Sequence, residues 1–443
     1  MSEQAAAVVP AKRWVYVIPV AVVMYMLAYL DRNNVSVILA FISKNDPSMS
    51  LTPSATGMAA GIFFVGYMFL QIPGALLAQK WSAKKTVLIL MVLWSFAAMS
   101  CGMVHTQGQL YFARFVLGFF EGGVWPSVLV LLASWFPLKE RARANALWMI
   151  CLPLSSMLMA PLSGVLLSHI SWRTVFIIEG IPPLVWAIVW WFVIKDHPHQ
   201  AKGIDPNERD WIETQLKKDE EPLANLPHAN YLDALKSGRT WMLIGIYFFW
   251  ISGFYGFSMW LPTAIKNLGF SSPTVVGWLT AIPYTCALVT MILVSRWCDR
   301  TGNRKLALGI PMIVALVFMI IGQFVPQTNT PQHVIAIVLL CIVGMGVYAP
   351  YGPFWVVPAE SLPPAVLAFS MGLINALGNL GGFLGPYAVG WLNGATGNSK
   401  SGYFFLALLL AIGALMSLLL VKNPNLVRGK QTAASSAVTD SAK

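Results

Sequence analysis

Charged residues are scarce in this sequence: lysine, arginine, aspartate and glutamate make up 11% of its 443 residues, whereas 57% are hydrophobic. A typical soluble domain is about 25% charged. A chain with so few charges cannot cover its apolar side chains with a hydrated surface, so these side chains need lipid. The composition therefore predicts a membrane protein with many spans.

The sequence also lacks the short motifs of enzymes. It contains no Walker-type glycine loop for ATP, no GxSxG and no HExxH. Its five cysteines form no CxxC pair, and neither they nor the six histidines show metal-ligand spacing. We therefore expect no enzyme activity, no metal and no cofactor. The driving force must be an ion gradient, such as a proton gradient, or the gradient of the substrate itself.

Twelve apolar stretches are long enough to cross a bilayer, which takes about 20 helical residues. The first is too long for a signal peptide and ends in charges rather than a small-residue cleavage site, so it predicts a retained helix. The fold class is therefore all-α. The predicted spans are 14–42, 52–79, 86–104, 109–136, 143–168, 174–195, 240–265, 274–296, 306–325, 333–357, 365–392 and 402–421.

Six spans, a polar loop and six more spans predict two packed six-helix bundles. The predicted parts are an N-terminus (1–13), an N-terminal bundle (14–195), a central loop (196–239), a C-terminal bundle (240–421) and a disordered tail (422–443). A weak repeat supports this division, because the residues that follow the second span resemble those that follow the eighth. Parallel repeats of six helices are a transporter architecture.

Positive charge follows the predicted topology. Of the 29 lysines and arginines, 23 lie in the termini and in alternate loops, which predicts that both termini and the central loop are cytoplasmic. The net charge of +11 therefore needs no nucleic-acid partner. Long uncleaved spans and modest loops favour a bacterial inner membrane. Glu179, near the start of the sixth span, is expected at the membrane interface beside Arg173, as a surface pair that contributes little.

The central loop contains one predicted helix. Asp205 is interpreted as its N-cap and Glu208 as the glutamate of a capping box. Trp211, Ile212 and Leu216 give this helix an apolar side, so we expect it to lie against the bundle or the membrane surface.

Four charged residues fall well inside predicted spans, away from the span ends. Asp31 and Arg32 lie in the first span, where each costs about 2.5–3.5 kcal/mol to insert. Arg114 and Glu121 lie in the fourth span on one helix face, about 10 Å apart, which is too far for a direct pair. Each is therefore expected to find partners on neighbouring helices. The four charges sum to zero and predict a buried network, which is either purely structural or used for transport.

These residues resemble the major facilitator superfamily over about 14–421 and, within it, the anion:cation symporter family. That family includes proton-coupled carriers of galactonate and other sugar acids, tartrate and phthalate. The resemblance implies a monomer of twelve helices that works by alternating access. It rests on Tyr29-Leu30-Asp31-Arg32-Asn33, Arg114…Glu121, Trp135-Phe136-Pro137…Glu140-Arg141-Ala142-Arg143, Trp260-Leu261-Pro262 and Asn375…Gly378-Asn379-Leu380-Gly381-Gly382.

The resemblance implies a role for each buried charge. Arg32 would bind the substrate carboxylate, which its planar fork can hold through two hydrogen bonds. Asp31 and Glu121 would carry protons, and Arg114 would be their counter-ion. Further substrate contacts are predicted at polar and aromatic residues, each of which could instead serve only packing. They are Tyr29, Tyr67, Gln71, Tyr255, Trp355, Asn375 and Asn379.

Charges in the loops after spans two, four and eight are predicted to gate the cytoplasmic side. The family's second-span loop usually carries aspartate, arginine and glycine, but Gln79, Lys80 and Ser82 stand there in this chain. The predicted gating residues are Lys84, Glu140, Arg141, Asp299, Arg300 and Arg304.

The function predicted is a proton-coupled symporter that imports a small organic acid anion, such as a sugar acid. A uniporter, exchanger or exporter of the same anions is the alternative. A membrane sensor without transport is less expected, because no extended soluble domain is present. The pattern does not predict which acid is carried.

Overall fold

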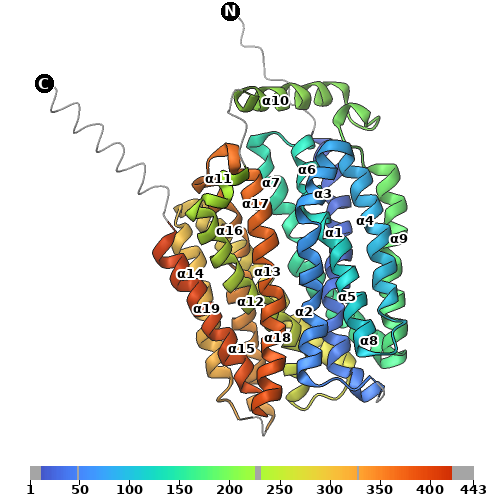
Figure 1. Cartoon of the computed structure of the whole chain (residues 1–443), viewed down its shortest axis with the longest axis vertical. Coiled ribbons are helices and arrows are strands. Elements are labelled where there is room, and N and C mark those ends of the chain that lie inside the picture. Colours follow the sequence, from blue (N-terminus) through green and yellow to red (C-terminus); the bar gives the residue numbers. More distant parts are fainter. Residues whose placement is uncertain (1–10, 47–48, 225–230, 327–328, 422–443) are drawn as a thin grey trace, which may run out of the picture. The chain divides into compact units, whose positions relative to one another are not determined.

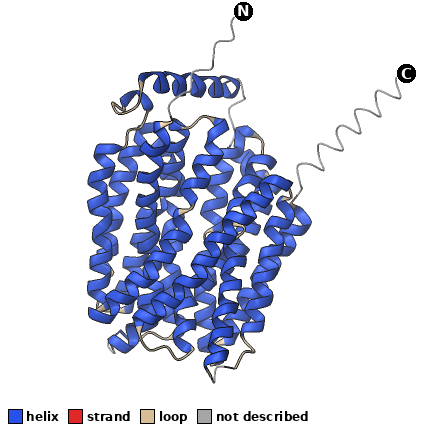
Figure 2. Ribbon diagram, turned by 180° about the vertical axis from the view of Figure 1, so that it is seen from behind, coloured by secondary structure: helices blue, strands red, loops and turns tan. Residues whose placement is uncertain are grey.

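The computed structural model describes residues 11–46, 49–224, 231–326 and 329–421, and this part of the chain holds helices and no strand (Figures 1 and 2). Ten of its helical stretches are long and apolar enough to cross a membrane. The all-α membrane fold is therefore confirmed for these residues. The start of the predicted N-terminus and the predicted disordered tail lie outside them.

The first half of the chain runs through ten elements. They are α1 (Lys12–Asn45), α2 (Pro53–Phe69), α3 (Gln71–Leu77), the π-helix η2 (Ala78–Ser82), α4 (Ala83–Ser100), α5 (Gln107–Gly122), α6 (Val124–Trp135), α7 (Leu138–Met149), α8 (Cys151–His169) and α9 (Trp172–Val193).

The central loop and the second half follow. The loop holds η3 (Pro198–Gln200), α10 (Pro206–Ala224) and α11 (Tyr231–Lys236). The later helices are α12 (Gly238–Asn267), α13 (Pro273–Thr301), α14 (Arg304–Gly322), α15 (Thr330–Tyr348), α16 (Tyr351–Ser361), α17 (Pro364–Gly378), α18 (Gly381–Thr396) and α19 (Lys400–Leu420).

Of the five predicted spans that the structure divides between two helices, two are not among the ten stretches above. The span at 52–79 breaks at Leu70, so that α2 and α3 are separate helices. The span at 365–392 breaks at Asn379 and Leu380, between α17 and α18. Prolines and glycines near both breaks weaken the helical hydrogen-bond ladder. Together with the ten longer stretches, these interrupted helices account for the twelve predicted spans.

The described chain forms two compact units. The first contains Met1–Asn34, Ile62–Met159 and Ile170–Ala229, and the second contains Val35–Gly61, Ala160–His169 and Asn230–Lys443. The end of α1, the start of α2 and the end of α8 thus belong with the second half of the chain. Within that unit the backbone of Gly277 lies so close to Ala160 that a side chain would not fit. The domain boundaries expected from chain order stay a prediction.

In the first unit, glycines bring α5 into backbone contact with α2. A Cβ atom at Gly118 would collide with the carbonyl oxygen of Phe63, and one at Gly122 with that of Tyr67. Small residues allow helices in a membrane to approach this closely. As a result, the aromatic side of α2 lies beside Glu121 of α5.

The central-loop helix α10 lies on the first unit, as its apolar side predicted. Ile212 is fully buried. Asp205 caps the helix through the amide of Asn207 at 2.9 Å. The expected capping-box role of Glu208 is wrong, because its carboxylate binds Arg13 instead: it accepts the Arg13 amide at 3.1 Å and Nη1 at 2.8 Å. A buried guanidinium without a carboxylate partner is strongly destabilising, whereas the amides at an exposed helix terminus can hydrogen-bond to water.

Candidate functional site

A buried ion pair joins two of the predicted residues across α1 and α5. Arg32 donates from Nη2 to Oε2 of Glu121 at 3.1 Å and from Nε to the same oxygen at 3.3 Å. The other oxygen, Oε1, has no hydrogen-bond donor among the described residues. The pair is thus made through one carboxylate oxygen rather than two, although the side chains are 3% and 0% exposed.

Aromatic rings surround the guanidinium of Arg32. Its Cζ lies 4.6 Å from the ring centre of Tyr67, 5.2 Å from that of Tyr29 and 5.1 Å from that of Phe63. The hydroxyl of Tyr67 lies 3.4 Å from that of Tyr25, the fourth ring of this cage. Ring faces attract cations, so the cage stabilises the guanidinium without using its donors. The sequence pointed to Tyr29 and Tyr67, but not to Phe63 or Tyr25.

Asp31 and Arg114 complete this network. Asp31 accepts a hydrogen bond from Trp94 Nε1 at 3.2 Å, and its Oδ1 has no donor among the described residues. Arg114 donates to the main-chain oxygens of Asp31 and Arg32, both at 3.1 Å. Its hydrogen bonds therefore hold the backbone of α1 at these two residues. The four charged residues predicted as a network do lie together.

A fifth charged residue of this region was misplaced by the sequence. Glu179 does not pair with Arg173 at the interface; it is 3% exposed and accepts a hydrogen bond from Asn34 Nδ2 at 2.9 Å. Arg173 instead lies over the ring of Trp172 and donates to a main-chain oxygen. The sequence does contain a signal for the burial of Glu179, because it is an ionisable residue within an apolar span. Inserting such a residue into a membrane costs free energy unless it is paired or has a function.

In the second unit, the predicted amides lie together at the break of α17. Asn379 donates from Nδ2 to Oδ1 of Asn375 at 2.8 Å, and Tyr247 donates to the same oxygen at 3.5 Å. Trp355 packs edge-on against Tyr247, at 5.3 Å between ring centres. Tyr255 is buried beside Phe254. Gln71 is buried at the start of α3 in the first unit.

The predicted gating residues of the first unit bind other partners than the family pattern implies. Asp196 accepts the amide of Lys84 at 2.8 Å and the hydroxyl of Ser82 at 2.6 Å, so a carboxylate from the end of α9 caps α4. Asp196 thus supplies a carboxylate next to the loop after the second predicted span, which contains no aspartate of its own. Glu140 pairs with Arg13 at 2.7 Å. Arg141 donates to a main-chain oxygen of α6.

In the second unit, the predicted gating residue Arg304 forms two ion pairs. Arg304 lies 3.2 Å from Asp299 and 3.0 Å from Glu360. These ion pairs join the start of α14 to the end of α13 and to the end of α16. Arg300 is exposed on the last turn of α13. These contacts are consistent with a structural clamp, and their gating role stays a prediction.

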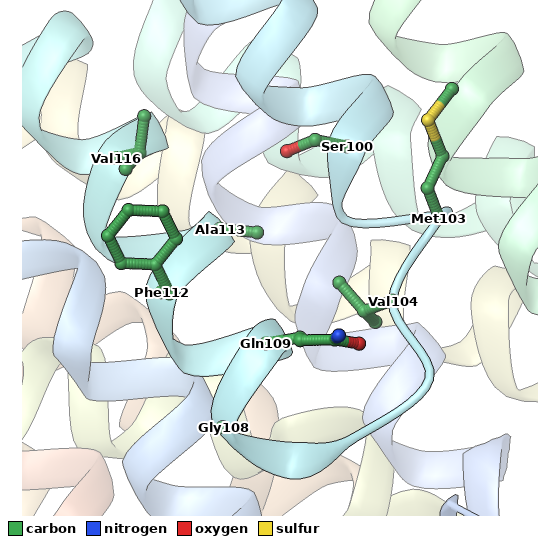
Figure 3. Close-up of a pocket in the computed structure, with 8 residues that line it drawn as sticks. All are labelled: Ser100, Met103, Val104, Gly108, Gln109, Phe112, Ala113 and Val116. Atoms are coloured by element: carbon green, nitrogen blue, oxygen red, sulfur yellow. The ribbon is translucent and has the colours of Figure 1, made fainter.

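A pocket of about 460 Å³ lies apart from these charges, between the end of α4 and the start of α5 (Figure 3). It holds no charged side chain, and Phe112 on its rim is 70% exposed. Its lining therefore provides no cationic side chain for an anion. Its lining residues are Ser100, Met103, Val104, Gly108, Gln109, Phe112, Ala113 and Val116.

Comparison with known families decides what kind of protein carries this network. The sequence profile of the Major Facilitator Superfamily matches residues 21–386 and 270–441. The chain belongs to the Major Facilitator Superfamily. It is therefore a membrane transporter rather than an enzyme, and the predicted fold of twelve helices in two six-helix bundles is confirmed.

Relatives within this superfamily match nearly the whole chain. A putative tartrate transporter of Agrobacterium vitis is 30% identical over 413 residues, which cover 92% of this chain and 90% of the relative. The inner membrane transport protein RhmT of Escherichia coli is 31% identical over 417 residues, with 91% and 93% covered. A quinolone resistance transporter of Acinetobacter baumannii is 29% identical over 408 residues, with 90% and 92% covered.

Solved structures of the superfamily share the fold. A bacterial homolog of the human lysosomal transporter Spinster, inward-facing and unoccupied, superposes with a TM-score of 0.74 at 18% identity, over 93% of this chain and 97% of that one. A D-xylose–proton symporter gives a TM-score of 0.69 at 16% identity, over 92% and 98%. At such low identity the likeness concerns the fold alone.

Proposed function

We propose that this transporter imports a small organic acid anion together with protons, by alternating access. The observation that carries the proposal is the ion pair between Arg32 and Glu121. It is buried, it uses one oxygen of the carboxylate, and aromatic rings surround its guanidinium. Such a pair can be broken without moving the arginine.

Breaking the pair couples the proton to the substrate. A proton on Oε1 of Glu121, the oxygen without a donor, removes the charge that holds Arg32. The guanidinium then binds the carboxylate of the substrate, in the bidentate geometry that arginine favours. When the proton leaves, the glutamate again competes for the arginine and the substrate is released. Asp31 is the second acceptor in the same network.

Further observations support the proposed substrate class and orientation. One relative is named for tartrate, an organic diacid. The excess of lysine and arginine on the α10 side supports a cytoplasmic location for both termini and the central loop. The roles of Tyr255, Trp355, Asn375 and Asn379 in binding the rest of the acid stay predictions, as do the monomeric state and the absence of a cofactor.

Uptake into proteoliposomes tests this proposal. Labelled tartrate, D-glucarate and benzoate represent hydroxy-diacids, sugar acids and aromatic acids. With an inward proton gradient, we expect uphill accumulation of at least one acid, abolished by a protonophore and by Arg32→Ala. Accumulation that ignores the gradient would favour the alternative, an exchanger or uniporter, and efflux against the gradient would favour an exporter.

Glu121→Gln separates coupling from binding. The amide keeps the size of the side chain but cannot take up a proton, so uphill accumulation is expected to vanish while exchange of labelled for unlabelled acid remains measurable. Glu213→Gln, on the exposed side of α10, is the matched control and should accumulate the acid as the unaltered protein does. Proton-driven accumulation by Glu121→Gln would remove Glu121 from the mechanism.

A further inference from the structure

The charges buried in the first unit do not balance. Away from the α10 end, its buried charged side chains among the described residues are three carboxylates and two guanidiniums: Asp31, Glu121, Glu179, Arg32 and Arg114. Full ionisation would give this buried set a net charge of −1, which is unfavourable in a low-dielectric interior. One bound proton makes the set neutral. A substrate anion on Arg32 then requires a second proton.

Glu179 lies on the far side of Asp31 from α10. Helices α1 and α9 run antiparallel, as three contacts along them show: Tyr16 OH donates to Val193 O, Trp186 Nε1 to Val20 O, and Asn34 Nδ2 to Glu179. Asn34 follows Asp31 by three residues, about 4.5 Å along the helix axis. In the orientation proposed above, Glu179 is therefore nearer than Asp31 to the extracytoplasmic side.

Glu179 faces the protein interior rather than lipid. The next residue, Gly180, accepts a hydrogen bond from Ser95 of α4, and a Cβ atom there would collide with Met99. On the other side, α1 presents Asn34, whose side chain binds Glu179, and Asp31 three residues earlier. The other titratable groups of α4 lie at its two ends: Lys84, Lys85 and Cys101.

We propose that Glu179 is a further proton-binding site of this transporter, through which protons from the extracytoplasmic side reach Asp31. In this step the O–H bond of protonated Glu179 breaks, one forms on the Asp31 carboxylate, and the negative charge moves to Glu179. Asn34 positions the glutamate by its hydrogen bond. The proposal rests on the proton coupling proposed above, and it adds the entry point and a third acceptor.

Infrared spectroscopy tests the site without any substrate. Protonated carboxyl groups give a separate C=O stretching band, which is titrated with pH in the purified transporter in lipid nanodiscs. Glu179→Gln should lose part of this band, because the amide still accepts the Asn34 hydrogen bond but binds no proton. Asp31→Asn and Glu121→Gln should each lose another part. A band unchanged in Glu179→Gln would show that Glu179 binds no proton and would overturn the proposal.

Transport then separates a proton path from a structural role. In the same proteoliposomes, with the acid that gives the highest uptake, Glu179→Gln should slow proton-driven uptake by roughly a hundredfold or more, the typical effect of losing a proton-transfer group. Glu179→Asp should restore part of the rate and shift its pH profile. If Glu179→Gln has the rate and pH profile of the unaltered protein, the path does not run through it.

The two proposals can fail separately. If Glu121→Gln still couples protons while Glu179→Gln loses its infrared band and its rate, the pair mechanism falls and the Glu179 site stands. If Glu121→Gln uncouples and Glu179→Gln does not differ from the unaltered protein, the reverse holds. Thermal unfolding of each variant in detergent checks folding, and Asn34→Asp, which places a second carboxylate against Glu179, gives an independent disturbance of the site.

Discussion

At the residue scale, Arg32 makes two kinds of contact at once, with aromatic ring faces and with a carboxylate, and a lysine could not make both. Its planar guanidinium lies against several ring faces and still directs donors at Glu121. An ammonium group is a point charge that offers no planar fork to a carboxylate. In the proposed mechanism, the geometry of the Arg32 side chain therefore links substrate binding to the protonation of Glu121.

Arg32→Lys is expected to keep the charge but lose affinity. Loss of bidentate binding should raise the KM for the transported acid by roughly tenfold or more, equivalent to about 1.4 kcal/mol of binding free energy. The measurement is the initial uptake rate at increasing substrate concentration. Arg173→Lys, at the start of α9, is the control and should keep its KM. An unchanged KM in Arg32→Lys would mean that this side chain does not hold the carboxylate.

At the element scale, α10 is fixed to the first unit through one buried arginine. Arg13 is shared between Glu208 of α10 and Glu140 of α7, and it also lies over the ring of Trp211. The amide of Leu138 adds a hydrogen bond to Asp219 at 2.7 Å. These contacts thus attach the central-loop helix to the rest of the first unit.

Glu208→Ala should loosen this helix. Removal of one partner from a buried ion pair costs about 3–5 kcal/mol, and we expect the lower end because Arg13 retains Glu140. Faster cleavage by trypsin after Lys217 and Lys218, in the last turns of α10, measures the effect. Glu213→Ala removes only an exposed contact and should not change the rate. Equal cleavage rates in the two variants would show that the buried pair does not hold α10.

The sequence predicts elements better than it predicts partners. Hydropathy over some 20 residues suffices to find spans, so the all-α fold and the members of the charge network were found. Which helix face points inward depends on packing between distant segments, and this hid the contact between Asn34 and Glu179, 145 residues apart. For the same reason, Asp196 could not be recognised as the cap of α4.

At the scale of the whole molecule, the charge distribution makes a testable statement about orientation. In a chain without other cysteines accessible from outside, Lys202→Cys near α10 and Lys400→Cys at the start of α19 replace exposed lysines on opposite predicted sides. A maleimide that cannot cross the membrane should label Lys400→Cys in intact cells and Lys202→Cys only after the cells are opened. The opposite pattern would invert the proposed topology and the direction of proton entry.

The surplus carboxylate of the first unit also determines how membrane voltage acts on transport. Each unbalanced charge that crosses a bilayer against 100 mV requires about 2.3 kcal/mol of electrical work. A monoanion that enters with one proton crosses without such work, whereas a dianion needs two protons. With three carboxylates beside two guanidiniums, the unit has room for that second proton, so an acid with two negative charges can enter a cell whose interior is electrically negative.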